Sequence, residues 1–197
     1  MQRRITGILC VWVSAIALWA SAGSHHWVQS EQAVGGLTSI SPCPSDIGDC
    51  SSVLYSRMDQ LAPALNPLHT TIRHSEEERL FTMLGSYTHL LAQCAAIILL
   101  FTGFAGLLEI GLEGHLSFPR ICLLLLASLL MVSLAFLSAL PLDNVLGRLL
   151  HHASMGPAVP LHLFGILIGA FGSALVWQPI RGDREILPNQ RLQHLSP

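Results

Sequence analysis

Four long apolar stretches divide this chain, and they limit its possible folds more than any other feature. They cover residues 5–22, 86–112, 118–140 and 158–178. A helix needs about 20 apolar residues to cross a hydrocarbon core about 30 Å thick, and each stretch reaches or approaches that length. Hydrophobic residues make up 51% of the chain and charged residues 11%, which excludes a soluble globular domain. The sequence therefore predicts a small integral membrane protein with four transmembrane helices.

The arginines predict how these helices are oriented. The chain has no lysine, and its arginines are spread singly or in pairs, so it carries no electrostatic footprint for nucleic acid. Arg3 and Arg4 precede the first stretch, Arg120 lies beside the second connection, and further arginines follow the fourth stretch. Connections rich in arginine stay in the cytoplasm, so both termini are predicted to be cytoplasmic. The predicted cytoplasmic segments are residues 1–4, 113–117 and 179–197, and the predicted extracellular loops are residues 23–85 and 141–157.

The first stretch has a second interpretation, as a secretory signal peptide within residues 1–22. It combines a basic start with an apolar run, and Ala20, Ser21 and Ala22 form a small-residue cleavage site. Cleavage would leave three membrane helices and an extracellular N-terminus. We favour a retained helix, because the run is long for a signal core and contains bulky tryptophans.

Two of the five cysteines stand apart from the others. Cys10, Cys94 and Cys122 lie in apolar stretches, where a thiol usually behaves as a small hydrophobic group. Cys43 and Cys50 enclose a turn-forming segment of the first extracellular loop, on the oxidising side of the membrane. We expect a disulfide bond between them. The alternatives are free or separately paired thiols, or a zinc site, which would need a second Cys or His pair at ligand spacing.

The same loop contains strand-like and helix-forming segments. Residues 27–37 alternate imperfectly between apolar and polar and end in Gly-Gly-Leu, while residues 52–55 follow the second cysteine. Two antiparallel strands joined by the cysteine-containing turn are therefore predicted. Farther along, Ser75 precedes three glutamates and can cap a helix, so the second helix is expected to start near Ser75 and to project above the membrane.

The order of residues after the first apolar stretch resembles a known family. Trp27 comes first, followed by Gly36, Leu37, Cys43 and Cys50. This order is similar to the first extracellular loop of the claudin, epithelial membrane protein and peripheral myelin protein superfamily, which carries a tryptophan, a Gly-Leu-Trp triplet and two disulfide-bonded cysteines. The resemblance implies an all-α membrane protein, with a four-helix transmembrane bundle and a small disulfide-clipped extracellular β-sheet.

Two details refine this resemblance. The string His25, His26 and Trp27 also resembles the start of the loop in voltage-dependent calcium-channel gamma subunits. Thr38 stands where the family has the last tryptophan of its triplet, which favours the wider superfamily over a barrier-forming claudin. The likeness to gamma subunits implies lateral association with a channel or receptor.

The fourth apolar stretch has small residues at the spacing that close helix packing needs. Gly165, Gly169 and Ser173 recur every fourth residue along one helix face. Helices in lipid associate through such faces, because hydrophobicity supplies no drive for association there. We expect this face to pack within the bundle, and the alternative is a surface that binds another protein.

Histidines and carboxylates offer few catalytic candidates. Four histidines are predicted to lie toward the outer side of the membrane: His89, His151, His152 and His162. They are candidates for a haem or metal site, but a role as polar residues at the membrane interface is favoured. The chain lacks the Cys-x-x-Cys motif of membrane disulfide-forming enzymes. Glu109 is expected to reach the cytoplasmic interface rather than to relay protons. No catalytic residue, metal or cofactor is predicted.

The sequence thus predicts a non-enzymatic, claudin-like four-span protein of the plasma membrane. Its expected partners are the lipid bilayer and a channel, receptor or similar subunit, with which it associates laterally as an auxiliary subunit would. A cell–cell adhesion or junction protein is the first alternative, and a haem- or thiol-dependent membrane oxidoreductase is the second. Trp27 and Leu37 are expected to anchor the extracellular sheet at the lipid interface.

Overall fold

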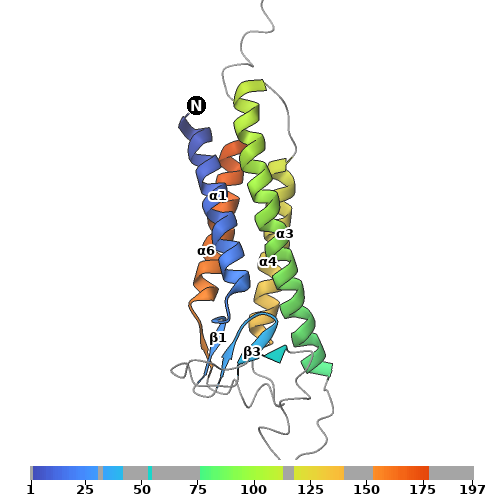
Figure 1. The fold of residues 1–197 in the computed structure, drawn as a ribbon. Coiled ribbons are helices and arrows are strands. Elements are labelled where there is room, and N and C mark those ends of the chain that lie inside the picture. The colour runs from blue at the N-terminus through green and yellow to red at the C-terminus, as the bar shows by residue number, and fades with distance from the viewer. Residues whose placement is uncertain are drawn as a thin grey trace, which may run out of the picture.

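Four long helices that alternate in direction form the body of the protein (Figure 1). The computed structural model describes residues 2–30, 33–41, 53–54, 76–112, 118–139 and 153–177. The helices are α1 (Gln2–Gly23), α3 (Glu76–Leu112), α4 (Phe118–Ser138) and α6 (Ala158–Trp177). Each contains a segment long and apolar enough to cross a membrane. The start of α1 and the end of α6 therefore lie at the same end of the bundle (Figure 1).

One helix is much longer than its apolar stretch. α3 begins at Glu76, next to Ser75, where the sequence places a helix N-cap. It has 37 residues, which corresponds to about 55 Å at a rise of about 1.5 Å per residue. The segment that can cross a membrane is Arg79–Leu108. α3 therefore extends beyond a hydrocarbon core about 30 Å thick.

The closest helix contact joins α1 to α6. A Cβ atom added at Gly172 would lie 2.9 Å from the carbonyl oxygen of Gly7, and one added at Gly169 would fall on the Ser14 hydroxyl. The Ser14 hydroxyl also donates a 2.6 Å hydrogen bond to the carbonyl oxygen of Gly165. Backbones that approach this closely gain dispersion contacts and polar bonds, which hold helices together in lipid.

The other helices complete a ring around the core. α1 packs most extensively on α6 and next on α3, while α4 packs on α3 and α6. Gly103 of α3 leaves room for the indole of Trp12. A Cβ atom at position 103 would collide with that indole. The Trp12 ring lies 5.5 Å from the ring of Phe104, centroid to centroid. α1 is thus held on two sides, by α6 and by α3.

A small antiparallel sheet lies at the opposite end of the bundle from the start of α1 (Figure 1). Its strands are β1 (Val28–Gln29), β2 (Val34–Gly35), β3 (Ser39–Ser41), β4 (Val53–Leu54) and β5 (Ser154–Met155). They pair in the order β4-β3-β2-β1-β5. β5 directly precedes α6, so the sheet joins two segments that are far apart in the sequence. We refer to this end of the bundle as the sheet end.

The strands differ from the sequence prediction in number. A single strand was expected over residues 27–37, but two strands, β1 and β2, pair there as a hairpin. The turn between them is closed by a 2.9 Å bond from the Ser30 N–H to the Ala33 carbonyl. β4 lies within the predicted strand of residues 52–55, but its partner is β3, which lies beyond the predicted strand of residues 27–37; β3 and β4 pair antiparallel on either side of the segment that contains Cys43 and Cys50. Both cysteines lie outside the described residues.

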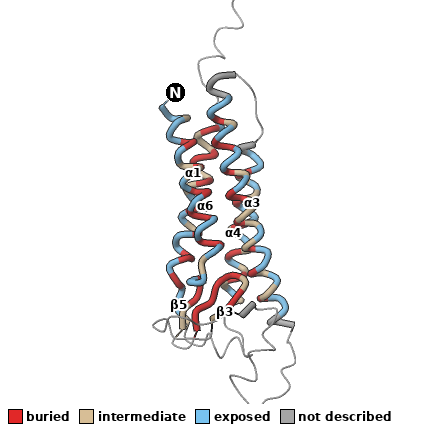
Figure 2. Tube along the Cα trace, in the orientation of Figure 1, coloured by how far each residue is buried: buried red, intermediate tan, exposed pale blue. Residues whose placement is uncertain are grey.

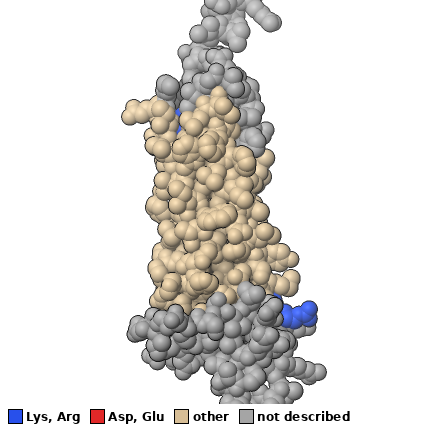
Figure 3. Space-filling view, viewed as in Figure 1, with Lys and Arg blue, Asp and Glu red and all other residues tan. Residues whose placement is uncertain are grey.

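The surface of the bundle separates into an apolar belt and polar ends. Along the helices, buried positions alternate with exposed ones, so each helix has one inward and one outward face (Figure 2). Many outward side chains are large and apolar, including Leu124, Met131, Leu167 and Phe171. On the face in Figure 3, the described middle of the bundle carries no charged side chain. This belt matches a lipid bilayer, which indicates an integral membrane protein.

The packing of α1 indicates whether residues 1–22 are cleaved as a signal peptide. Removal of residues 1–22 would expose the buried glycine face of α6 to lipid and would delete Val11, Ala15 and Leu18 from the core. We expect the mature protein to retain α1. Intact mass measurement of protein purified from membranes should give a mass that includes these residues, and a mature N-terminus at Gly23 would contradict the prediction.

Candidate functional site at the sheet end of the bundle

Trp27 links the sheet to three of the helices. Its side chain has no exposed surface, and its indole N–H donates a 2.7 Å hydrogen bond to the carbonyl oxygen of Ser21 in α1. The indole ring contacts Phe136 of α4 edge-on, at 6.0 Å between centroids, and His162 of α6 at 4.8 Å. Trp27 therefore fixes the chain that enters the sheet relative to α1, α4 and α6.

The backbone of Trp27 is held as firmly as its side chain. The Trp27 N–H donates to the Gly35 carbonyl at 2.9 Å, and the Trp27 carbonyl accepts from the Gly156 N–H at 2.9 Å. Gly156 is required at this contact, because a Cβ atom there would collide with the carbonyl oxygen of His26. The start of α6 thus lies directly against the strand that follows α1.

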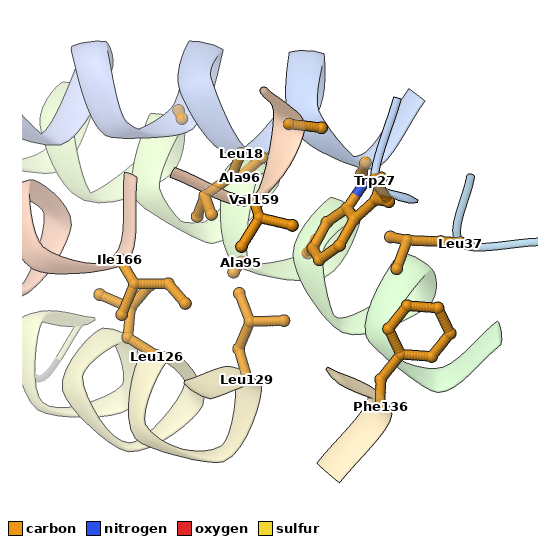
Figure 4. Packing of buried hydrophobic residues seen from close by; sticks show 14 of the residues in the cluster. Leu18, Trp27, Leu37, Ala95, Ala96, Leu126, Leu129, Phe136, Val159 and Ile166 are labelled. Atoms are coloured by element: carbon orange, nitrogen blue, oxygen red, sulfur yellow. The ribbon is translucent and has the colours of Figure 1, made fainter. Parts of the chain in front are cut away.

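Leu37 occupies the same interior region as Trp27. It is 1% exposed and lies beside Trp27 and Phe136 in the buried cluster (Figure 4). Gly85 of α3 permits this approach, since a Cβ atom at Gly85 would collide with the Leu37 carbonyl oxygen. Gly36, the third residue of the loop signature, donates a 2.8 Å bond from its N–H to the Ser39 carbonyl in the turn between β2 and β3.

These positions correct the expected role of Trp27 and Leu37. Both were expected to anchor the sheet at the lipid interface, but both are buried inside the bundle. The reason is that Trp27 packs against α1, α4 and α6, and that Gly85 lets α3 approach the backbone of Leu37. Burial of a tryptophan there supplies apolar contacts on every side together with a partner for its N–H.

His162 is the centre of a buried polar cluster next to Trp27. Its Nδ1 atom lies 3.0 Å from the Ser21 hydroxyl of α1, and its Nε2 atom lies 3.0 Å from the Ser133 hydroxyl of α4. His162 is 1% exposed, and both serines are fully buried. The cluster therefore connects α1, α4 and α6 by hydrogen bonds at the level where Trp27 enters the bundle.

A neutral imidazole can use both of its ring nitrogens in this cluster. Such a ring has one N–H donor and one nitrogen lone pair, and each serine hydroxyl can both donate and accept. Ser21 also lies 3.0 Å from the carbonyl oxygen of Leu18, and Ser133 lies 2.7 Å from that of Leu129. The serine that accepts from the ring donates to its helix carbonyl, and the other serine donates to the ring instead of to its own helix carbonyl.

A second histidine supports the same junction. The Nδ1 atom of His89 in α3 lies 3.0 Å from the carbonyl oxygen of Ala22 near the end of α1. Its Nε2 atom lies 3.0 Å from the side-chain nitrogen of Gln93, one helical turn along α3. Because the Gln93 amide donates to Nε2, the ring N–H is at Nδ1 and donates to the carbonyl of Ala22. His89 thus ties α3 to α1.

The sequence grouped four histidines as a possible metal or haem site, and the structure describes two of them, His89 and His162. His162 and His89 have serine, glutamine and backbone partners. Among the described residues, no three His, Cys, Asp or Glu side chains lie close enough together to hold a metal ion. His151, His152 and the Glu109 side chain lie outside the described part of the chain.

The glycine face of α6 contacts α1 inside the bundle. A Cβ atom at Gly165 would lie 3.1 Å from Leu18, and one at Gly169 would lie 3.2 Å from Leu126 of α4. Ser173 is fully buried, and its hydroxyl has no hydrogen-bond partner within the described residues. These three residues therefore form part of the core between α1, α4 and α6.

The remaining cysteines are free thiols within the described helices. Cys122 of α4 is buried, and its sulfur lies 2.9 Å from the Thr102 hydroxyl of α3. The Thr102 hydroxyl also donates a 2.8 Å bond to the carbonyl of Ile98, so the Cys122 thiol is the donor to Thr102. This contact ties α3 to α4 on the far side of the core from α1.

Sequence reasoning missed the cluster that the structure builds around His162. Ser21 appeared only as part of a cleavage site, and Ser133 was not considered. One feature of the sequence could have indicated the cluster. Ser21, Ser133 and His162 are polar residues in otherwise apolar stretches, and all three lie near the ends of these stretches that are predicted to face the same side of the membrane. Their pairing depends on helix rotation, which hydropathy alone does not fix.

Comparison with known proteins does not assign a family to this chain. The chain matches no protein-family model and no curated protein. His162, Ser21 and Ser133 have at most 1% of their surface exposed, so solvent has no direct access to the cluster. Its chemistry is that of a structural junction between the sheet and the bundle.

Replacing His162 with leucine is expected to cost about 1 to 2 kcal/mol of stability, because the variant loses two interhelical hydrogen bonds. The loss stays moderate since Ser21 and Ser133 keep their helix carbonyls as acceptors. Unfolding in mixed detergent micelles measures the change. Leu161→Ala is the control, because Leu161 is 40% exposed on the outward face. Equal stability of His162→Leu and the native protein would contradict the role of the cluster.

Proposed function

We propose that this protein is a claudin-like four-span membrane protein that acts without catalysis, by lateral association with another membrane protein. The partner is a channel, a receptor or a similar subunit, and this chain serves as an auxiliary subunit in the plasma membrane. In this proposal the sheet end faces the outside of the cell, and Cys43 and Cys50 form a disulfide bond in the segment between β3 and β4.

The observation that carries the proposal is the fixed attachment of the sheet to the helices. Trp27 contacts α1, α4 and α6 at once, and Gly85 brings α3 against the backbone of Leu37. The sheet therefore has a defined position at one end of an apolar bundle. A sheet in a defined position on transmembrane helices suits recognition of a neighbouring membrane protein, because little ordering entropy is lost on binding.

α4 is the helix best placed for contact with such a partner. In its most apolar segment 28% of residues are buried inside the protein, against 50% in α1. Its exposed face includes the small residues Ala127 and Ser128 as well as Met131. Small residues let another helix approach closely in lipid. We therefore assign the lateral contact to the outward face of α4.

Site-specific photo-crosslinking in native membranes tests this assignment. A photoreactive residue at Met131 of α4 is compared with one at Ile16 of α1, because both side chains are 68% exposed. The expected result is one membrane protein, cross-linked from position 131 and not from position 16, that also co-purifies in constant ratio in mild detergent. Equal cross-linking from both positions, or no co-purifying protein, would contradict the proposal.

Two other outcomes would point to the alternative functions. Accumulation at contacts between transfected cells, in strand-like assemblies, would favour adhesion over lateral association. Bound haem in the visible spectrum of the purified protein, or a stoichiometric metal, would favour an oxidoreductase and would overturn the proposal of a non-enzymatic role.

A further inference from the structure

Three arginines lie at one level, at the end of the bundle opposite the sheet. Gly7 of α1 packs against Gly172 of α6, and a Cβ atom added at Gly7 would lie 3.0 Å from Val176. Arg3 and Arg4 lie one helical turn before Gly7, and Trp177 directly follows Val176. The two helices run antiparallel, so these arginines are level with Trp177, the last residue of α6.

The third arginine reaches Trp177 from another helix. The guanidinium carbon of Arg120, near the start of α4, lies 4.7 Å from the centroid of the Trp177 ring. Arg3, Arg120 and Trp177 are exposed, with 47% exposure at Trp177. We call Arg3, Arg4, Arg120 and Trp177 the arginine end of the bundle.

Within the described part of the chain, Arg120 contacts the Trp177 ring and makes no hydrogen bond through its side chain. A guanidinium group stacks on an aromatic ring through its flat face, while its N–H groups point outward in the plane. Among the described residues, none accepts a hydrogen bond from Arg120. Contact with the Trp177 ring limits the orientations of the Arg120 side chain, which reduces the entropy lost when its N–H groups bind an anion.

The position of this group defines the kind of anion that reaches it. Tryptophan side chains at helix ends lie at the level of lipid headgroups. Guanidinium groups bind phosphate oxygens through two parallel hydrogen bonds. The starts of α1 and α4 both lie here, and helix N-termini add partial positive charge. The donor fork of Arg120 beside Trp177 therefore suits a phosphate diester carried by a lipid, and Arg3 and Arg4 add positive charge at the same level of the bundle.

We infer that the arginine end is a binding site for the headgroup phosphate of an anionic phospholipid. Arg120 supplies the oriented donor pair, Trp177 positions it, and Arg3 and Arg4 add the charge that distinguishes an anionic headgroup from a zwitterionic one. The site is independent of the proposed function, because it uses the end of the bundle that carries no sheet.

Native mass spectrometry of the full chain in detergent tests the site with phosphatidylserine and phosphatidylcholine as probes. Arg120→Gln is expected to weaken phosphatidylserine binding about fivefold, the effect of losing one arginine near an anionic headgroup. Arg79→Gln is the matched control, since Arg79 is an exposed arginine of α3 near the sheet end, and it should leave binding unchanged. Arg120→Lys keeps the charge without the donor fork and should give an intermediate affinity.

Three results would overturn the inference. The first is an equal loss of phosphatidylserine binding in Arg120→Gln and Arg79→Gln. The second is equal affinity of the native protein for phosphatidylserine and phosphatidylcholine. The third is displacement of phosphatidylserine by millimolar inorganic phosphate. The last would identify a site for free phosphate rather than for lipid. Protection of Cys122 from alkylation, measured on the same samples, establishes that each variant is folded, because this thiol is buried in the native protein.

Discussion

Replacing Trp27 with alanine is expected to destabilise the protein by about 3 to 5 kcal/mol, the range for deleting a buried aromatic side chain. The variant loses the ring contacts with Phe136 and His162, and it leaves the Ser21 carbonyl without the indole donor. Unfolding in mixed detergent micelles, followed by alkylation of the buried thiol of Cys122, measures the loss. In this variant we also expect the sheet to detach from the bundle before the helices separate from one another.

Trp19 provides the matched control for this experiment. It lies in α1, about one turn before that helix ends at Gly23, and it is 54% exposed on the outward face. Trp19→Ala should therefore change stability by less than about 1 kcal/mol, as surface substitutions do. If the two alanine variants lost equal stability, the role of Trp27 as the link between sheet and bundle would be wrong.

The second large effect is expected at Gly169. A leucine side chain there would begin on the Ser14 hydroxyl and run into Leu126, so α1 and α6 would have to move apart. Overpacking a tight contact costs about 1 to 3 kcal/mol, and more when backbones must separate. Since the Ser14 bond to the Gly165 carbonyl would also break, we expect a loss of about 3 kcal/mol or more in the same unfolding assay.

Gly23→Leu separates this steric effect from the general effect of replacing a helix glycine. Gly23 ends α1, and no atom lies within 4 Å of a Cβ atom built there. The variant should fold with nearly native stability. Comparable losses at Gly23 and Gly169 would show that the close approach of α1 and α6 contributes little.

Hydropathy was sufficient to predict the helices. Each apolar stretch became one helix, and the serine before three glutamates correctly indicated where α3 starts. Helix formation in a membrane depends on a local property, the need to satisfy every backbone hydrogen bond within one segment, so the sequence of that segment carries the information. The small residues of α6 were recognised for the same reason, because their spacing is visible within one stretch.

The sheet and the polar cluster depend on contacts between distant segments. β5 at Ser154–Met155 pairs with β1, although residues 154–155 have no strand pattern of their own. The partners of His162 are 141 and 29 residues away in the chain. Which residues meet is decided by the rotation of each helix and by the turn at Gly156, and neither is encoded in hydrophobic periodicity. Trp27 was assigned to the lipid interface because its buried partners could not be identified.

The central claim is that strands from two distant segments form one sheet at one end of a four-helix bundle, the end that we propose faces the outside of the cell. The most direct measurement is disulfide formation in Gln29→Cys/Ser154→Cys, two positions directly opposite each other in β1 and β5. With intact cells and a membrane-impermeant oxidant, peptide mapping should recover positions 29 and 154 as one cross-linked pair. Two thiols that stay unlinked, or that react only after the cells are opened, would contradict the account.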